Sequence, residues 1–448
     1  MEMRDWMLND TIVAIASAES ISAISIIRVS GEDAINIVNK VFTKNLLEVN
    51  SHTIHYGHII DLDKNIVDEV LVSVFKAPRS FTMENIVEIN CHGGTFITKK
   101  ILTLLLSVGA RLATPGEFTR RAFLNGRIDL TQAEAIQDLL EASHDTQLQM
   151  AIGALKGSVQ KLLEPLNEQL VQMISNIEVN IDYPEYDDVP TLTHEVLLPL
   201  SEQWLIDIDN LLDKANSGKI VKEGIQTAII GRPNVGKSSL LNALLEEDKA
   251  IVTDIAGTTR DIVEGDIRLK NITLHLMDTA GIRNTEDEIE RIGIDKSKKV
   301  VEDAQLIILV LDNSSNLTSE DEQLLEMTKD KERIVVYNKS DINTLHQGIT
   351  ISAKDGAIQA LIDEINSRYL EHIKMIENGT FGNERQIALL FSAKQAMLEV
   401  NRALKDNVEL DLVAIDLQVV YQMLQEIIGN YSKENLLDEI FSRFCLGK

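Results

Sequence analysis

Apolar and polar positions between residues 11 and 105 follow two different spacings. Several stretches are rich in β-branched residues and bounded by turn residues, which is typical of strands. Others repeat apolar residues at the three-to-four-residue spacing of a helix. The first 125 residues are therefore predicted to form an α+β module. The predicted strands span residues 11–16, 23–29, 53–60, 69–75 and 86–90, and the predicted helices span residues 34–42 and 96–105.

Longer helical patterns begin near Thr131. The spacing Thr131-x-x-Glu134 has the form of a capping box, and an apolar stripe follows it. An acidic loop bounded by prolines, residues 182–190, interrupts this pattern, and residues 218–224 are predicted to lead into a strand. Because each helix has an apolar face without another partner, the helices are predicted to pack together as one domain. They cover residues 131–180, 196–215 and 417–428.

The stretch Gly231-Arg-Pro-Asn-Val-Gly-Lys-Ser238 lies between an apolar run, residues 227–230, and a helical run, residues 239–245. It fits the pattern G-x-x-x-x-G-K-[ST]. Between a strand and a helix, such a loop turns its backbone N–H groups inward, and Lys237 adds a cation where the β- and γ-phosphates would lie. The stretch predicts a site for a nucleoside triphosphate.

Three further motifs follow in the order found in GTPase domains: Asp278-Thr-Ala-Gly281, Asn338-Lys-Ser-Asp341 and Ser352-Ala-Lys354, each closing an apolar run. Asp341 can accept two hydrogen bonds from the N1–H and 2-amino edge of guanine. Adenine has no amino group there, so the carboxylate would remain unpaired. The sequence therefore favours GTP over ATP.

Net charge is −27 over 448 residues, which would repel the phosphate backbone of a nucleic acid. A protein of this charge that handles nucleic acid should need a local basic patch or a basic partner. The two cysteines, Cys91 and Cys445, cannot form a disulfide framework, which fits a reducing compartment. No apolar run reaches about 18 residues, and residues 1–10 do not read as a signal or transit peptide, so the expected location is cytoplasmic, away from membranes.

Together with the GTPase motifs, residues 115–129, 290–294 and 444–448 make the chain resemble the MnmE (TrmE) family of tRNA modification GTPases along its whole length. The resemblance implies a homodimer that works with an FAD-dependent partner of the MnmG (GidA) type, in a heterotetramer or larger complex. It also implies modification of carbon 5 of the wobble uridine of tRNA, a carboxymethylaminomethyl addition that uses a one-carbon unit from a tetrahydrofolate derivative in its 5-formyl or methylene form.

The expected fold is multidomain, α/β and α: an N-terminal α+β folate-binding domain and a helical domain interrupted by an inserted Ras-like P-loop GTPase domain. The predicted ranges are 1–125 for the N-terminal domain that binds folate and dimerises, 126–218 for the first helical part, 219–372 for the GTPase domain, and 373–448 for the second helical part with the terminal Cys-Leu-Gly-Lys.

The expected GTP-binding residues are grouped by motif. They are Asn234, Val235, Gly236, Lys237, Ser238 and Ser239; Thr253, Asp254, Ile255, Ala256, Gly257, Thr258 and Thr259; Asp278, Thr279, Ala280 and Gly281; Asn338, Lys339 and Asp341; and Ser352, Ala353 and Lys354. Ser238 is expected to hold Mg²⁺, and Thr259 is similar to the switch threonine that supplies a second ligand.

Position 282, where Ras-type enzymes carry a water-orienting glutamine, is isoleucine. The resemblance puts the general base at Glu290, with Lys237 as a further catalytic group; the alternative for Glu290 is a solvated glutamate on a charged helix. The resemblance also implies a K⁺ ion between the α- and γ-phosphates. Its ligands would come from Asn234, Thr253, Ile255 and Thr258, although Asn234 could instead only stabilise the loop turn.

For folate, the resemblance implies Arg28, Glu88, Arg127 and the terminal Lys448; surface ion pairs are the alternative. Cys445 is either a small buried hydrophobe or a reactive, catalytic thiol beside the folate. Two other functions remain open: a ribosome-assembly GTPase, and a scaffold whose dimer is opened and closed by the nucleotide. Such assembly GTPases usually append a basic RNA-binding module, whereas the tail here is acidic and helical.

Overall fold

The computed structural model describes residues 10–182, 194–251, 265–277, 300–375, 379–431, 434–442, 444 and 447. The chain forms two compact units. Unit 1 comprises Met1–Gln137 and Gln425–Lys448, and unit 2 comprises Asp138–Leu424. Both ends of the chain thus belong to unit 1. The four domain ranges expected from the sequence are a finer division, and they stay a prediction.

Unit 1 is built on a six-stranded sheet in the order β3-β4-β5-β2-β1-β6. Neighbouring strands are antiparallel, except that β6 pairs with β1 in parallel. The strands are β1 (Ile12–Ile15), β2 (Ile24–Ser30), β3 (Thr53–Ile60), β4 (Ile66–Phe75), β5 (Ile86–His92) and β6 (Arg111–Leu112). The helices are α2 (Ala34–Asn39), α3 (Thr95–Ser107), α4 (Glu117–Leu124) and α16 (Glu434–Ser442), while the unit boundary falls within α5 (Leu130–Glu141) and α15 (Leu410–Ile428).

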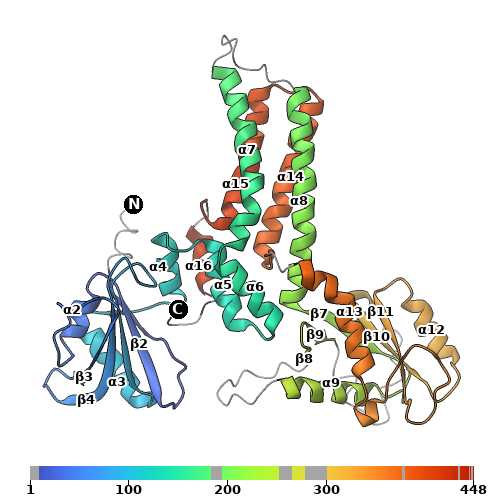
Figure 1. The fold of residues 1–448 in the computed structure, drawn as a ribbon, viewed down its shortest axis with the longest axis horizontal. Helices are drawn as coiled ribbons and strands as arrows, with labels where there is room; N and C mark the ends of the chain where they lie inside the picture. Colours follow the sequence, from blue (N-terminus) through green and yellow to red (C-terminus); the bar gives the residue numbers. More distant parts are fainter. Residues whose placement is uncertain are drawn as a thin grey trace. The chain divides into compact units, whose positions relative to one another are not determined.

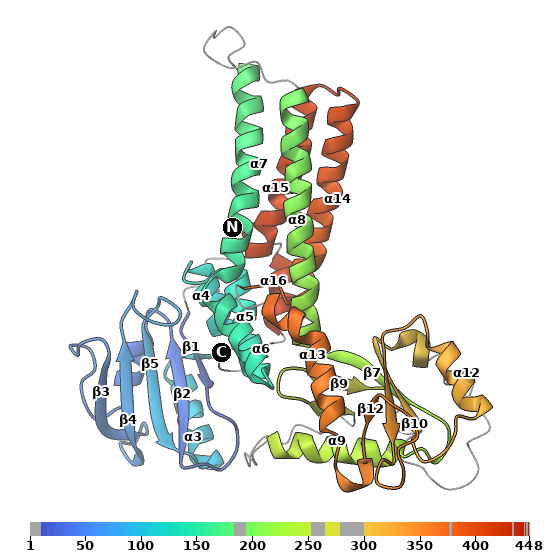
Figure 2. The same ribbon diagram turned by 45° about the vertical axis from the view of Figure 1, so that its right-hand side comes forward.

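Alternation along the strands gives this sheet one apolar face, which α2 and α3 cover (Figure 2). Ile27 and Val29 of β2 and Ile89 of β5 are fully buried there against Ile101 and Leu105 of α3. Residues one position away point to the opposite face. That face therefore receives Arg28 and Glu88, which are paired across β2 and β5.

The C-terminal segment packs on helices that directly follow the N-terminal sheet. Leu130 of α5 is buried with Phe441 of α16 and with Phe444. Arg120 of α4 forms an ion pair with Asp438 of α16 at 2.8 Å. Apolar burial and this ion pair therefore hold the end of the chain within unit 1.

A buried ion network ties α4 to the edge of the sheet in unit 1. The Arg121 side chain is 2% exposed and its guanidinium contacts Asp10 at 2.5 Å and Glu84 at 3.1 Å. Arg111 contacts Asp10 and, at 2.6 Å, Glu117. Burial works to raise the pKa of Glu117, but hydrogen bonds from Arg111 and from the Thr114 backbone outweigh it and lower that pKa.

We expect this network to make unit 1 sensitive to acid. A carboxyl group whose pKa is lowered by folding stabilises the fold above its unfolded pKa of about 4, and that stabilisation is lost as pH falls through the folded pKa. Glu117→Gln should therefore reduce the free energy of unfolding by about 1.5 kcal/mol at pH 7 and much less at pH 3. Hydrogen exchange of the β1 and β2 amides measures this, with Glu48→Gln, an exposed substitution, as the control. An equal loss at both pH values would contradict the assignment.

Unit 2 contains a bundle of long helices, α7 (Ser158–Asp182), α8 (His194–Glu223), α14 (Glu384–Lys405) and α15, together with α6 (Asp145–Leu155). α7 and α8 precede the second sheet in sequence and α14 and α15 follow it, yet all four lie side by side (Figure 1). Trp204 is fully buried and donates to the Leu166 carbonyl at 3.1 Å, and Asn401 donates to Ser201 at 2.9 Å. This confirms the prediction of a helical domain interrupted by another domain.

The second sheet of the molecule lies in unit 2 and has the order β12-β11-β10-β7-β9-β8. Only β8 is antiparallel to its neighbour. Its strands are β7 (Ile225–Ile230), β8 (Asp266–Arg268), β9 (Thr273–Leu276), β10 (Leu306–Asp312), β11 (Arg333–Asn338) and β12 (Ile349–Thr350). Helices α9 (Lys237–Ile251), α12 (Ser319–Met327) and α13 (Gln359–Met375) flank it, with a 3₁₀ turn at Ala353–Asp355. All of β10 is buried, as expected for a central parallel strand covered on both faces. The expected α/β domain is confirmed.

Two local predictions were wrong. The cap of α5 is formed by Asp129, which accepts from the Gln132 amide at 2.8 Å while Gln132 accepts from the Asp129 amide at 3.0 Å; Thr131 only donates to Asp129. A carboxylate is the stronger acceptor at a positive helix end. The helix predicted over residues 196–215 is longer than expected, because α8 continues to Glu223 before the chain enters β7. Gly218 is required there for contact, because a Cβ would lie 2.2 Å from the Phe381 carbonyl.

In the part of the chain described here, no helix combines the length and the apolar character needed to cross a membrane.

Candidate nucleotide-binding site

The loop between β7 and α9 has the backbone shape of a phosphate cradle. Asn234 and Gly236 adopt left-handed φ angles of +62° and +99°. A Cβ at Gly236 would lie 2.2 Å from the Asn338 amide nitrogen, and one at Gly231 would lie 2.4 Å from the Val310 carbonyl. Both glycines are therefore needed for the loop to lie this close to β10 and β11.

Lys237 is the first residue of α9 and its ammonium group turns back over the loop. It donates to the carbonyls of Gly231 at 2.8 Å and Arg232 at 2.9 Å. Ser238 and Ser239 follow in the first turn of α9. The site thus combines a helix N-terminus with a lysine cation, a combination that favours an anionic ligand.

Asn338 joins two of the predicted motifs. This residue is 2% exposed, and its amide donates to the Val235 carbonyl at 2.9 Å and accepts from the Ala353 amide at 3.0 Å. The phosphate loop, the end of β11 and the turn after β12 therefore meet at the carboxyl edge of one sheet. This edge is where open α/β sheets bind ligands.

The residues around Asn338 place the carboxylate of Asp341 at this edge of the sheet with one side open to solvent. Lys339 has a φ of +67° and its ammonium contacts Asp312 at 2.7 Å. Burial tends to raise the pKa of Asp312, but hydrogen bonds from Lys339 and Ser314 lower it. Asp341 is exposed and accepts from the Ser352 hydroxyl at 3.1 Å, which leaves a carboxylate edge turned to solvent.

Several expected site residues lie outside the described residues, so the structure gives no position for them. They are Thr253, Asp254, Ile255, Ala256, Gly257, Thr258, Thr259, Asp278, Thr279, Ala280, Gly281, Glu290, Cys445 and Lys448. Across the ranges that are described, no group of three or more His, Cys, Asp or Glu side chains is arranged to hold a metal ion.

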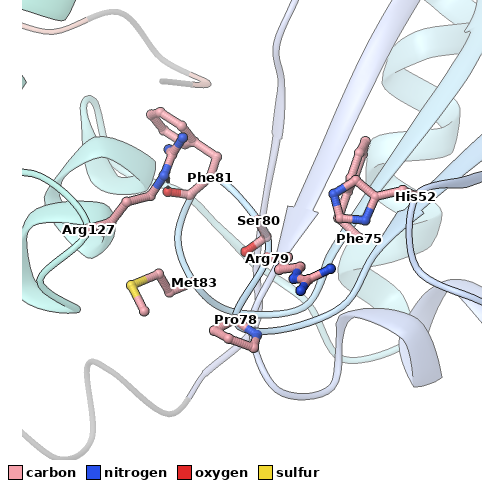
Figure 3. Close-up of a pocket in the computed structure, with 8 residues that line it drawn as sticks. All are labelled: His52, Phe75, Pro78, Arg79, Ser80, Phe81, Met83 and Arg127. Carbon is pink, nitrogen blue, oxygen red and sulfur yellow. Dashed lines mark hydrogen bonds between the residues drawn. The ribbon is translucent and has the colours of Figure 1, made fainter. Parts of the chain in front are cut away.

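The described residues expected to bind folate gather in unit 1 around one aromatic ring. Arg28 forms an ion pair with Glu88 at 2.9 Å, and its Cζ lies 5.8 Å from the Phe81 ring centroid. Arg127 donates to the Phe81 carbonyl at 2.9 Å and lies 5.0 Å from the same centroid (Figure 3). Arg28 also donates to the Gly447 carbonyl at 3.2 Å, which brings the C-terminal segment to this group.

Three residues were not identified from the sequence, although they shape the nucleotide site of unit 2 and the group of folate candidates in unit 1. The Phe81 ring centroid lies 5.8 Å from the Arg28 Cζ and 5.0 Å from the Arg127 Cζ, and the Phe118 ring centroid lies 5.7 Å from the Arg28 Cζ. Asp312 is the ion-pair partner of Lys339. Only Asp312 had a signal, since it closes an apolar run in the same way as the motif residues do.

The chain matches known protein families over most of its length. A family described as "MnmE helical domain" matches residues 130–445, and one described as "GTP-binding protein TrmE N-terminus" matches residues 11–127. Proteins named tRNA modification GTPase MnmE from Bacillus anthracis and Bacillus cytotoxicus are 48% and 47% identical to it over 455 aligned residues, covering 98% of this chain and 99% of each relative.

Among solved structures, the G domain of the T. maritima FeoB iron transporter is 24% identical, with a TM-score of 0.23, and covers 33% of this chain and 98% of that chain. Era in complex with MgGDPNP and a segment of 16S ribosomal RNA is 24% identical, with a TM-score of 0.25, and covers 38% of this chain and 66% of that chain. At TM-scores this low, the structural likenesses add no argument. Sequence identity over nearly the full length decides the matter: the chain belongs to the MnmE family of tRNA modification GTPases.

Proposed function

We propose that GTP binds at the carboxyl edge of the second sheet, with its phosphates on the loop 231–236 and the start of α9. The observation that carries this proposal is that the Asn338 side chain donates to the Val235 carbonyl and accepts from the Ala353 backbone N–H, which brings three motifs to one edge. Asn234, Val235, Gly236, Lys237, Ser238 and Ser239 surround the phosphates, and Asn338, Lys339, Asp341, Ser352, Ala353 and Lys354 surround the base.

Hydrolysis would need Mg²⁺ and a second source of positive charge. Ser238 would bind Mg²⁺ with Thr259, as a P-loop serine and a switch threonine do, which needs no acidic cluster. Asn234 is exposed on the loop, where its side chain can reach a cation beside the phosphates. We assign K⁺ to that place, with Thr253, Ile255 and Thr258 completing its ligands and Glu290 as the general base.

The GTPase cycle would serve modification of carbon 5 of the wobble uridine of tRNA, together with an FAD-dependent MnmG-type partner and as a homodimer. A tetrahydrofolate derivative would supply the one-carbon unit. Arg28, Glu88, Arg127 and Lys448 would bind the folate, because a carboxylate can pair with an aminopyrimidine edge and the cations can meet an anionic tail. The hydrogen bond from Arg28 to the Gly447 carbonyl supports a site to which the C-terminal segment contributes.

Mass spectrometry of tRNA nucleosides tests this function directly. In a strain that lacks its own copy of the gene, the unmodified chain should restore the modified wobble uridine. Lys237→Ala should not restore it, because the loop loses its phosphate-binding cation. Lys331→Ala should restore it fully, since Lys331 is a half-buried lysine of the same domain whose ammonium donates to the Glu302 carbonyl. If wobble uridine is modified normally without the gene while ribosomal subunits fail to mature, a ribosome-assembly GTPase is the better assignment.

A further inference from the structure

A pocket of about 580 Å³ opens in unit 1 beside the group of folate candidates. Its walls are the end of β4, the loop from β4 to β5, and Arg127. In Figure 3, Arg127, Phe81 and Met83 lie on one side and His52 and Phe75 on the other, with Ser80 and Arg79 between them. A volume of this order accommodates a nucleotide-sized ligand.

The pocket is cationic in an acidic chain. Arg79 and Arg127 are both exposed, and the lining contains no aspartate or glutamate. Glu84, the nearest carboxylate in the loop, is engaged by Arg121 and Ser30. Neither pocket arginine forms an ion pair within the described ranges; the Arg127 guanidinium donates to the Phe81 carbonyl, and the Arg79 guanidinium is the one available to a further anion. Against a net charge of −27, this is the local basic patch that an RNA-handling protein would need.

The same pocket offers aromatic surfaces on two sides. The rings of His52 and Phe75 meet edge to face at 5.4 Å, and the Phe81 ring lies under Arg127. A base can stack on such rings regardless of its sequence. A folate could also place its p-aminobenzoyl ring against His52 and Phe75 and its glutamate carboxylates against the arginines, so folate is the competing occupant that the experiment below separates from a nucleotide.

The loop that forms the pocket is held in place by its own hydrogen bonds. The Ala77 amide donates to the Asn85 side chain at 3.1 Å, and the Ser80 hydroxyl donates to the Glu84 carbonyl at 2.5 Å. Asn125, from the end of α4, donates to the Thr82 carbonyl at 2.6 Å. A loop fixed in this way lowers the ordering cost of binding.

We propose that this pocket binds one unpaired nucleotide of the tRNA substrate, with a phosphate at Arg79 and the base against Phe75 and His52. The proposal rests on the proposed function and adds the RNA contact to it. Phe81 borders both the pocket and Arg28. A nucleotide held here would therefore lie next to the folate candidates, as transfer of a one-carbon unit requires of its donor and acceptor.

Fluorescence anisotropy with the full-length protein tests the proposal. The probes are an unmodified tRNA transcript, its anticodon stem-loop, and a fully paired hairpin of equal length. Arg79→Glu should weaken binding of the tRNA and the stem-loop by roughly tenfold and lower the slope of log affinity against log salt by about one. His52→Asn should weaken binding by at least about fivefold through lost stacking. Both variants should lose the preference for the looped probe over the paired one.

Lys100→Glu is the matched control, because it makes the same charge change at an exposed position of α3 outside the pocket. It should bind tRNA within about twofold of the unmodified protein. Binding of 5-formyltetrahydrofolate is measured in parallel. The proposal is overturned if Arg79→Glu binds tRNA normally, if Lys100→Glu is equally weak, or if Arg79→Glu loses folate instead of RNA. Failure of the unmodified protein to bind any tRNA would overturn this proposal alone, because the proposed function is tested separately by mass spectrometry of the wobble uridine and a partner could hold the tRNA.

Discussion

Asp341→Asn is expected to weaken GTP binding by at least about a hundredfold, because the carboxylate that would accept from both N1–H and the 2-amino group of guanine becomes an amide. One of those two donors would then face an N–H₂ group. One carboxylate oxygen of Asp341 accepts from the Ser352 hydroxyl, so the other edge of the carboxylate is presented to solvent in a defined position. Xanthine carries an oxygen in place of the 2-amino group, and the variant should therefore gain affinity for xanthosine triphosphate.

Titration calorimetry with GTP, ATP and xanthosine triphosphate measures this change of nucleotide preference. Asp355→Asn is the matched control, since Asp355 accepts from the same Ser352 hydroxyl at 2.7 Å but lies outside the motif. Its affinity for GTP should stay within about threefold of the unmodified protein. A loss of GTP affinity in both variants alike, with no gain for xanthosine triphosphate, would mean that the turn rather than a carboxylate-to-guanine contact had been disturbed.

Elements with strong periodicity could be predicted from the sequence. The alternating strands of unit 1 and the apolar run of β7 appear where they were expected, because one-sided or nearly complete burial leaves a clear pattern. The helical domain interrupted by a GTPase domain was also predictable, since helices on both sides of the second sheet had apolar faces without another partner.

Local contacts between distant residues were not predictable. The helix was predicted to end at residue 215, yet Gly218 lies within α8 and allows it to approach residues 380 and 381. The Arg28 contact with Gly447 joins residues 419 positions apart, and no spacing rule reports such a pair. The cap at Asp129 was missed because Thr131 and Glu134 fit the same template two positions later.

The candidate nucleotide site was likewise predictable from the sequence only in part. Motif spacing predicted that the loop 231–236 and the loops after β11 and β12 belong together, because each closes a strand at the same sheet edge. The connection through Asn338 depends on side-chain hydrogen bonds across three loops, and the sequence does not encode it in any spacing. The aromatic ring of Phe81 between two arginines likewise depends on how the β4–β5 loop folds back toward α4.

We expect GTP hydrolysis to be at least about tenfold faster in K⁺ than in Na⁺, since a cation between the phosphates takes the part that an arginine finger plays elsewhere. Asn234→Gly tests the proposed ligand without straining the loop, because glycine tolerates the φ of +62° at this position. In K⁺ this variant should hydrolyse GTP at nearly the rate that the unmodified protein shows in Na⁺. Its affinity for GTP should remain within a few-fold.

The most direct measurement is the single-turnover rate of GTP hydrolysis by the full-length protein in KCl, NaCl and choline chloride at equal ionic strength, with ATP as the comparison substrate. The account predicts fast hydrolysis only with GTP and K⁺, and a loss of the K⁺ effect in Asn234→Gly. Equal rates in the three salts, or equal turnover of ATP, would contradict a guanine-specific site completed by potassium.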